Sequence, residues 1–161
     1  MLSAIASYIL FLLPPFYKNY GKRLIKAPKV YFLDPGLVNY LIGIKNDSIL
    51  MNGPMAGAIF ENAIISEIVK GEYARGIKPE MYYWRSQSGI EIDLLMPIDG
   101  RITPFEIKLS SIIKPLFYKN LRYWLTLSGL ETEGYLITNC SEKLPLPDSI
   151  KNLYWREYLG R

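Results

Sequence analysis

The chain has 161 residues, half of them apolar, and its 19 Lys and Arg against 15 Asp and Glu give a net charge of +4. This length and composition predict a folded domain of ordinary size, and the mild basicity suits a polyanionic partner without identifying one. The sequence contains no His, which excludes a Ser-His-Asp triad, a His-metal nuclease and a zinc deaminase. The single cysteine, Cys140, excludes an intrachain disulfide and is expected to be a small buried hydrophobe in a protein of the reducing cytoplasm.

The N-terminal segment is apolar from Ala4 to Leu13 and stops at Pro14-Pro15. It is shorter than the roughly 20 apolar residues that span a bilayer, and it lacks the features of a signal peptide. We therefore predict no membrane span. The segment is expected to be a helix, and the apolar stretch from Met1 to Leu13 is expected to be covered by a partner surface or by a second copy of the chain.

Residues 1–50 are predicted to form a partial winged-helix-like segment, in the order helix, strand, basic turn, strand. The strands are expected at Leu12 to Tyr17 and at Lys29 to Leu33, and Asp34-Pro35-Gly36 predicts a turn into a short helix from Gly36 to Ile42. The basic residues of the turn are candidate phosphate contacts, although a solvated turn explains them equally well. They are Lys18, Lys22, Arg23 and Lys26.

Residues 51–161 are predicted to form one α/β (α+β) domain with a mixed central sheet flanked by helices, in the order αβββαβ. The second helix has an amphipathic face that includes Leu121 and Trp124, with Lys119 and Arg122 turned elsewhere. No Gly-rich loop followed by Lys-Ser/Thr occurs in the sequence, so no nucleotide is expected to bind through a P-loop. The elements are expected at residues 57–73 (helix), 80–85, 91–96 and 102–109 (strands), 115–128 (helix) and 134–138 (strand).

The residues with the strongest chemical signal flank a predicted β-hairpin. Asp99-Gly100 is a type I′ turn signal, and a two-residue loop there places Asp93 opposite Glu106 and Glu91 opposite Lys108. Alternation along the strands sends these four side chains to one face. The apolar residues between them, Ile92, Leu94, Phe105, Ile107 and Leu109, are expected on the other face.

Two carboxylates directly opposite each other repel unless a cation lies between them. Asp93 and Glu106 are therefore predicted to hold Mg²⁺ or Mn²⁺, which prefer carboxylate, water and phosphate oxygens. Lys108 would then hold the attacking water or stabilise charge on the phosphorane. A cross-strand ion pair between Glu91 and Lys108 on a solvated face is the structural alternative.

Glu61 is a further candidate ligand. Ile64, Ile65 and Ile68 follow it at helical offsets, so its carboxylate is expected on the apolar face of the first helix, with Asn62, Ser66 and Lys70 on the wet face. An acid near a helix N-terminus, favoured by the helix dipole, is the alternative explanation.

The order of these residues resembles the PD-(D/E)XK nuclease superfamily: an acid on a helix, then Asp, a hairpin and Glu-x-Lys. More closely, four blocks of the chain resemble the C-terminal domain of archaeal and bacterial AAA+-like ATPases. The blocks are KVYFLDPG (29–36), GAIFEN (57–62), YWR with GIEID (83–85 and 89–93) and FEIK (105–108).

The resemblance implies a restriction-endonuclease-like fold and a metal-dependent DNA phosphodiesterase, with Glu61, Asp93, Glu106 and Lys108 as catalytic residues. The first three of these would bind the metal. DNA would be the substrate, contacted also by Lys114 and Lys119, and an ATPase or a second copy of the chain would be the partner of the N-terminal segment. The alternative is a catalytically inactive DNA-binding or partner-docking module that has kept the nuclease fold.

Overall fold

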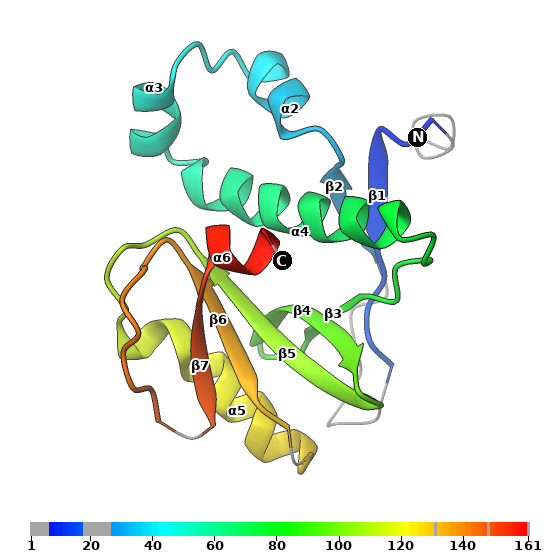
Figure 1. Cartoon of the computed structure of the whole chain (residues 1–161), viewed down its shortest axis with the longest axis vertical. Coiled ribbons are helices and arrows are strands. Elements are labelled where there is room, and N and C mark those ends of the chain that lie inside the picture. Colours follow the sequence, from blue (N-terminus) through cyan, green and yellow to red (C-terminus); the bar gives the residue numbers. More distant parts are fainter. Residues whose placement is uncertain (1–6, 18–26, 131, 148, 161) are drawn as a thin grey trace. The chain divides into compact units, whose positions relative to one another are not determined.

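The computed structural model describes residues 7–17, 27–130, 132–147 and 149–160, which Figure 1 draws as a coloured ribbon. The chain divides into two compact units. The first comprises Met1–Leu12 and Val30–Pro79, and the second comprises Leu13–Lys29 and Glu80–Arg161. The boundary predicted near residue 50 is a different division of the chain and remains a prediction.

The N-terminal part of the chain contains a two-stranded sheet of β1 (Leu10–Leu13) and β2 (Lys29–Phe32). The predicted helix over residues 4–13 is therefore wrong for Leu10–Leu13. The physical reason is local, because the residue before a proline avoids helical geometry and two prolines follow Leu13 at once. Residues 1–6 lie outside the described residues, and so do Lys18, Lys22, Arg23 and Lys26.

Asp34 starts the helix that follows β2, as the sequence predicts. Its carboxylate accepts hydrogen bonds from the backbone N–H groups of Gly36 (2.8 Å) and Leu37 (3.2 Å) at the start of α2 (Pro35–Leu41). This is the usual chemistry of an aspartate N-cap. A second short helix, α3 (Asp47–Asn52), was not predicted and is capped in the same way by Asn46.

Helix α4 (Ala56–Ala74) buries Ile64, Ile65 and Ile68, as predicted. The predicted position of Asn62 and Ser66 on the solvent-exposed face of the helix is wrong, since both are buried. Asn62 accepts a hydrogen bond from the Phe32 N–H (2.8 Å) and donates one to the Phe32 carbonyl (2.9 Å). Its amide thus satisfies both polar groups of one β2 residue, which explains why a polar side chain is tolerated there.

The second unit is built on a mixed five-stranded sheet in the order β3-β4-β5-β6-β7. Strands β3, β4 and β5 are antiparallel neighbours, whereas β6 and β7 run parallel to β5. The mixed α/β class is confirmed. The strands are β3 (Tyr82–Arg85), β4 (Glu91–Ile98), β5 (Arg101–Lys108), β6 (Gly134–Thr138) and β7 (Ile150–Tyr154), the last of which was not predicted.

Helices flank this sheet on both faces (Figure 1). A short 3-10 helix η1 (Pro115–Tyr118) leads into α5 (Lys119–Ser128), whose Leu121 and Trp124 join the main core with Leu136 of β6. Phe105 stacks on Tyr135 with ring centroids 5.3 Å apart and contacts Tyr158 of α6 (Trp155–Leu159) at 6.1 Å. Because Tyr135 and Leu136 are consecutive in a strand, α5 and α6 cover opposite faces.

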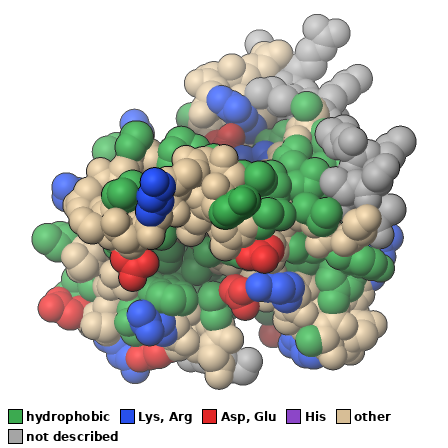
Figure 2. Space-filling model, turned by 90° about the horizontal axis from the view of Figure 1, so that it is seen from above, with side chains coloured by type: hydrophobic (Ala, Val, Ile, Leu, Met, Phe, Trp, Pro, Cys, Tyr) green, Lys and Arg blue, Asp and Glu red, His purple; other side chains and the backbone are tan. Residues whose placement is uncertain are grey.

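Helix α4 carries charged residues along its length. Helix α4, with 19 residues, includes Glu61, Glu67, Lys70 and Glu72. Among the described residues no helix has the length and apolarity needed to cross a membrane. On the face drawn in Figure 2, hydrophobic side chains are interspersed with acidic and basic ones.

Candidate metal centre on the β4–β5 hairpin

The turn of the β4–β5 hairpin sets the register of the two strands. Asp99 and Gly100 have φ angles of 49° and 77°, as a type I′ turn requires. The strands pair from Ile98 opposite Arg101 to Leu94 opposite Phe105. This confirms the predicted register for these five pairs, and the pairing of Asp93 with Glu106 remains a prediction.

A β-bulge lies in β4 at the predicted site. Tyr82 of β3 pairs with Leu95 and Trp84 pairs with Ile92, so β4 carries one extra residue between these two pairs. Ile92 and Leu95 consequently belong to the same core cluster. The predicted strict alternation is therefore wrong at this point, because a bulge turns side chains away from the regular pleat. No residue type in the segment marks the bulge.

Asp93, Glu106 and Lys108 converge at the end of the hairpin away from the turn. The Lys108 ammonium donates hydrogen bonds to Oδ2 of Asp93 (2.9 Å) and to Oε2 of Glu106 (2.7 Å). The Ile107 backbone N–H also donates to Oδ2 of Asp93 (2.9 Å). Asp93 is 6% exposed and Glu106 only 1% exposed. Two carboxylates and one ammonium thus share a site that is almost closed to solvent.

The three groups shift one another's protonation. Burial raises the pKa of Glu106 well above its usual range, and the Asp93 carboxylate raises it further. Burial alone would also raise the pKa of Asp93, but Lys108, a hydrogen bond from Glu106 and the Ile107 N–H outweigh burial and lower it. Burial alone would lower the pKa of Lys108, yet the two carboxylates raise it. Lys108 is therefore a cation at neutral pH and cannot serve as a base.

The donor atoms of this site fit a divalent cation. When Glu106 is ionised, no described residue donates a hydrogen bond to its buried Oε1, and an unsatisfied buried oxygen is costly. With both carboxylates ionised, the charge of Lys108 leaves one negative charge uncompensated. Mg²⁺ commonly takes one or two carboxylates and completes its shell with water and phosphate oxygens. Among the described residues no group of three or more Asp, Glu, His or Cys is placed to hold a metal, so the fit rests on this pair.

The Glu91 carboxylate belongs to a different ion-pair network. It lies 2.7 Å from Lys29 Nζ and 3.4 Å from Arg85 Nε, whereas Lys108 binds the site carboxylates. The alternative of a Glu91–Lys108 ion pair is therefore wrong. The structural reason is that β4 pairs Glu91 with Arg85 of β3, and the sequence spacing gave no signal for Lys29 as a partner.

The other predicted site residues lie apart from this triplet in the chain. Glu61 belongs to the first unit, where its Oε1 accepts a hydrogen bond of 2.6 Å from the Tyr31 hydroxyl, and its predicted role in the site remains a prediction. Lys114 and Lys119 are exposed and lie on either side of η1 in the second unit. Cys140 is buried, as predicted.

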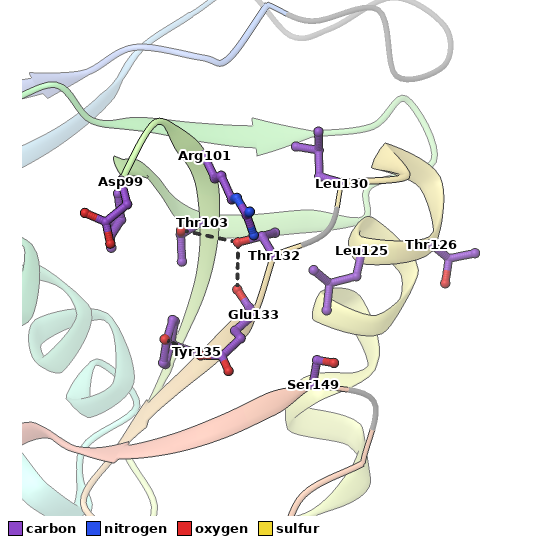
Figure 3. A pocket seen from close by; sticks show the side chains of 11 residues that line it. Asp99, Arg101, Thr103, Leu125, Thr126, Leu130, Thr132, Glu133, Tyr135 and Ser149 are labelled. Carbon is purple, nitrogen blue, oxygen red and sulfur yellow. Dashed lines mark hydrogen bonds between the residues drawn. The ribbon is translucent and has the colours of Figure 1, made fainter.

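A hollow of the second unit lies at the opposite end of the same hairpin (Figure 3). It has a volume of about 870 Å³ and is lined by residues that include Asp99, Arg101, Thr103 and Glu133. The Glu133 carboxylate is well partnered there, by Lys151 Nζ at 2.5 Å and by the Tyr135 hydroxyl at 2.6 Å. These two hydrogen bonds lower the pKa of Glu133. The hollow and the buried carboxylate pair therefore lie at different ends of the hairpin.

The fold and this triplet define a mixed α/β protein with a buried acidic pair on a β-hairpin. Residues 56–158 match the family described as Domain of unknown function (DUF4143), and residues 4–48 match the one described as Domain of unknown function (DUF8612). Since the first match spans more than half of the sequence, the chain belongs to the DUF4143 family.

Similar proteins are found in mycobacteria. Uncharacterised proteins of Mycobacterium tuberculosis and Mycobacterium bovis are each 37% identical over 140 residues, which is 86% of this chain and 30% of theirs. The chain thus spans less than a third of the length of these relatives. Beta-mannosidase A of Aspergillus fumigatus is 28% identical over 116 residues, 66% of this chain but 12% of that enzyme. So small a share carries no argument about activity.

Proposed function

We propose that the chain is a metal-dependent phosphodiesterase that acts on DNA, with a fold of the PD-(D/E)XK nuclease superfamily. One observation carries the proposal: Asp93 and Glu106 are buried side by side, and one Glu106 oxygen has no hydrogen-bond donor among the described residues when ionised. Buried carboxylate pairs are costly to a fold. Functional sites are where such pairs are usually kept.

Asp93 and Glu106 would hold a Mg²⁺ or Mn²⁺ ion. When bound, the cation would neutralise the carboxylates and lower the pKa of a coordinated water. The chain has no His, and Lys108 is protonated because the pKa of its ammonium is raised by both carboxylates. Among the described residues of this site there is thus no imidazole or neutral amine to act as a base, and the proposed reaction depends on the cation.

Lys108 has the position and the charge to act on a phosphodiester. Its side chain is about a third exposed, while the two carboxylates that its ammonium contacts are buried. A phosphate that approached from solvent would meet this cation first. Lys108 would then stabilise the negative charge that develops on the phosphate oxygens, or hold the attacking water through a hydrogen bond.

The partners of the whole protein are part of this proposal. The resemblance to the C-terminal domain of AAA+-like ATPases suggests an ATPase partner, with DNA as the common substrate. The mycobacterial relatives are more than three times as long as the segment they share with this chain, which leaves room in those proteins for further domains. A second copy of the chain is the other proposed partner of the N-terminal segment.

A second candidate function is an inactive DNA-binding or docking module. The favouring observation is that Lys108 already contacts both carboxylates and so occupies part of the role that a metal would play. A triplet stabilised in this way needs no catalysis to explain its retention.

Cleavage assays separate the two candidates. The purified chain should nick or degrade single-stranded, duplex or branched DNA with Mg²⁺ or Mn²⁺, and should fail with Ca²⁺ or a chelator. Asp93→Asn or Glu106→Gln should reduce cleavage at least about a hundredfold and should keep or tighten DNA binding without metal, because each removes a negative charge. Lys108→Ala should lose cleavage and also bind DNA more weakly.

Glu133→Gln is the matched control, since Glu133 is a carboxylate of the same sheet that hydrogen bonds to Lys151 and Tyr135. Its cleavage should equal that of the wild type. If the wild-type chain shows no metal-dependent cleavage of any of these substrates, and Asp93→Asn leaves DNA affinity unchanged, the docking module is the better account.

A further inference from the structure

A shallow groove of about 570 Å³ runs along the outer face of η1 and α5. It is lined by Pro115, Leu116, Lys119, Arg122, Tyr123 and Thr126. Among these six described residues the charged ones are both basic, and Lys114 lies immediately before the groove and is exposed. Such a lining attracts an anion along its length.

The groove also contains an exposed aromatic ring that packs against a buried one. Tyr123 is 42% exposed and Leu116 is 73% exposed. Behind Tyr123 lies Trp84, which is fully buried, with ring centroids 6.4 Å apart and an angle of 36° between the rings. The Trp84 ring supports Tyr123 from the core side and leaves part of the tyrosine ring to face solvent. A planar group can stack there at little entropic cost.

The helices that line the groove pack near the start of β4 and against β5. Asn120, the neighbour of Lys119, donates a hydrogen bond of 3.1 Å to the Glu91 carbonyl, and Asp93 follows two residues later on β4. Helix η1 packs against β5, which carries Glu106 and Lys108. All these residues belong to the second unit.

We infer that this groove binds a single strand of nucleic acid, with one base stacked on Tyr123 and phosphates near Lys119 and Arg122. Basic grooves that carry exposed aromatic rings are the general means by which proteins hold single strands. In a duplex the bases face one another and are not free to stack on the protein. The inference rests on the proposed function, because it names the form of DNA that the hairpin site would receive.

The test measures binding in the presence of a chelator, so that it does not depend on cleavage. Fluorescence anisotropy of a labelled twelve-residue oligothymidylate should show that Tyr123→Ala weakens binding about tenfold, whereas Tyr123→Phe keeps the affinity. Tyr40→Ala is the matched control, because Tyr40 is an exposed tyrosine on α2. Lys119→Ala should lower the slope of log affinity against log salt by about 0.7, and Lys143→Ala, at an exposed loop lysine, should leave it unchanged.

An abasic oligomer of equal charge should bind the wild type about tenfold more weakly than the oligothymidylate, and Tyr123→Ala should remove this difference. The inference is overturned if Tyr123→Ala and Tyr40→Ala have equal effects while both fold normally by circular dichroism. It is also overturned if a decaglutamate peptide of similar charge binds as well, which would indicate a groove for acidic peptides. The chain could bind single strands as predicted and still show no metal-dependent cleavage. That result would support the single-strand groove and would contradict only the proposed phosphodiesterase activity.

Discussion

The two ends of the β4–β5 hairpin hold carboxylates in opposite circumstances. At the turn end, Glu133 borders a large open hollow and is partnered by Lys151 and Tyr135. At the other end, Glu106 is 1% exposed, lies beside Asp93 and has an oxygen without a hydrogen-bond donor when ionised. The pKa of Glu133 is lowered by its hydrogen bonds, whereas the pKa of Glu106 is raised by burial and by Asp93.

From this difference we predict that a cation binds at the buried pair and not at the open hollow. A satisfied carboxylate in an open hollow has no tendency to bind a cation. A buried carboxylate with an open coordination position does, because a bound cation removes both the repulsion and the desolvation cost. The following predictions test the two ends against each other.

The largest expected effect is that of Lys108→Ala, which leaves two buried carboxylates without their common cation. We expect a loss of about 3 kcal/mol in the free energy of unfolding at neutral pH, at the lower end of the range for broken buried pairs, because the Lys108 side chain is 34% exposed. Urea denaturation at pH 7.5 measures it. A loss below about 1 kcal/mol, the size of a surface pair, would mean that the site is effectively solvated.

The pH dependence of stability should have opposite signs at the two ends. The raised pKa of Glu106 means that its stabilising contribution is complete below its ordinary value of 4.5 and is lost as pH rises through the folded value. Glu106→Gln should therefore gain stability relative to the wild type as pH rises above 4.5. The lowered pKa of Glu133 means that its contribution is present above 4.5 and is lost as pH falls. Glu133→Gln should thus be less stable than the wild type at neutral pH.

Thermal unfolding of the wild type and both variants from about pH 2 to about pH 8 measures these trends, because the Glu133 contribution is lost below pH 4.5. The difference in Tm between each variant and the wild type should vanish at the acid limit. As pH rises, the two differences should take opposite signs. Parallel curves for the two variants would contradict the contrast between the ends.

The smallest expected effect is that of Lys151→Ala at the turn end. Lys151 and Glu133 are 58% and 42% exposed, so their ion pair should contribute less than about 1 kcal/mol and should weaken in high salt. Denaturation of this variant at low and at high salt measures the effect. A large loss that salt does not reduce would show that the turn end also depends on a buried charge.

Much of the second unit could be predicted from its sequence. Asp99-Gly100 allows positive φ at both turn positions, and this turn sets the strand register from Ile98 opposite Arg101 to Leu94 opposite Phe105. The amphipathic face of α5 gave Leu121 and Trp124 as core residues. These features depend on local chemistry that a few residues carry by themselves.

What escaped prediction depends on partners that are distant in the sequence. Asn62 was assigned to the wet face because asparagine is usually exposed, yet its amide satisfies the Phe32 backbone 30 positions away. The bulge at Asp93 follows from pairing with β3 and has no residue signature. Leu10–Leu13 is a strand because β2 supplies its hydrogen-bond partners and prolines follow it.

The most direct test of the central claim is calorimetric titration of the chain with Mn²⁺ at pH 7.5, without DNA, which reports metal binding whether or not the protein is an active enzyme. We predict one Mn²⁺ bound per chain, lost in Asp93→Asn and in Glu106→Gln and retained in Glu133→Gln. Absence of Mn²⁺ binding by the wild type, or binding that survives Glu106→Gln unchanged, would contradict the assignment of a metal centre to the buried end of the hairpin.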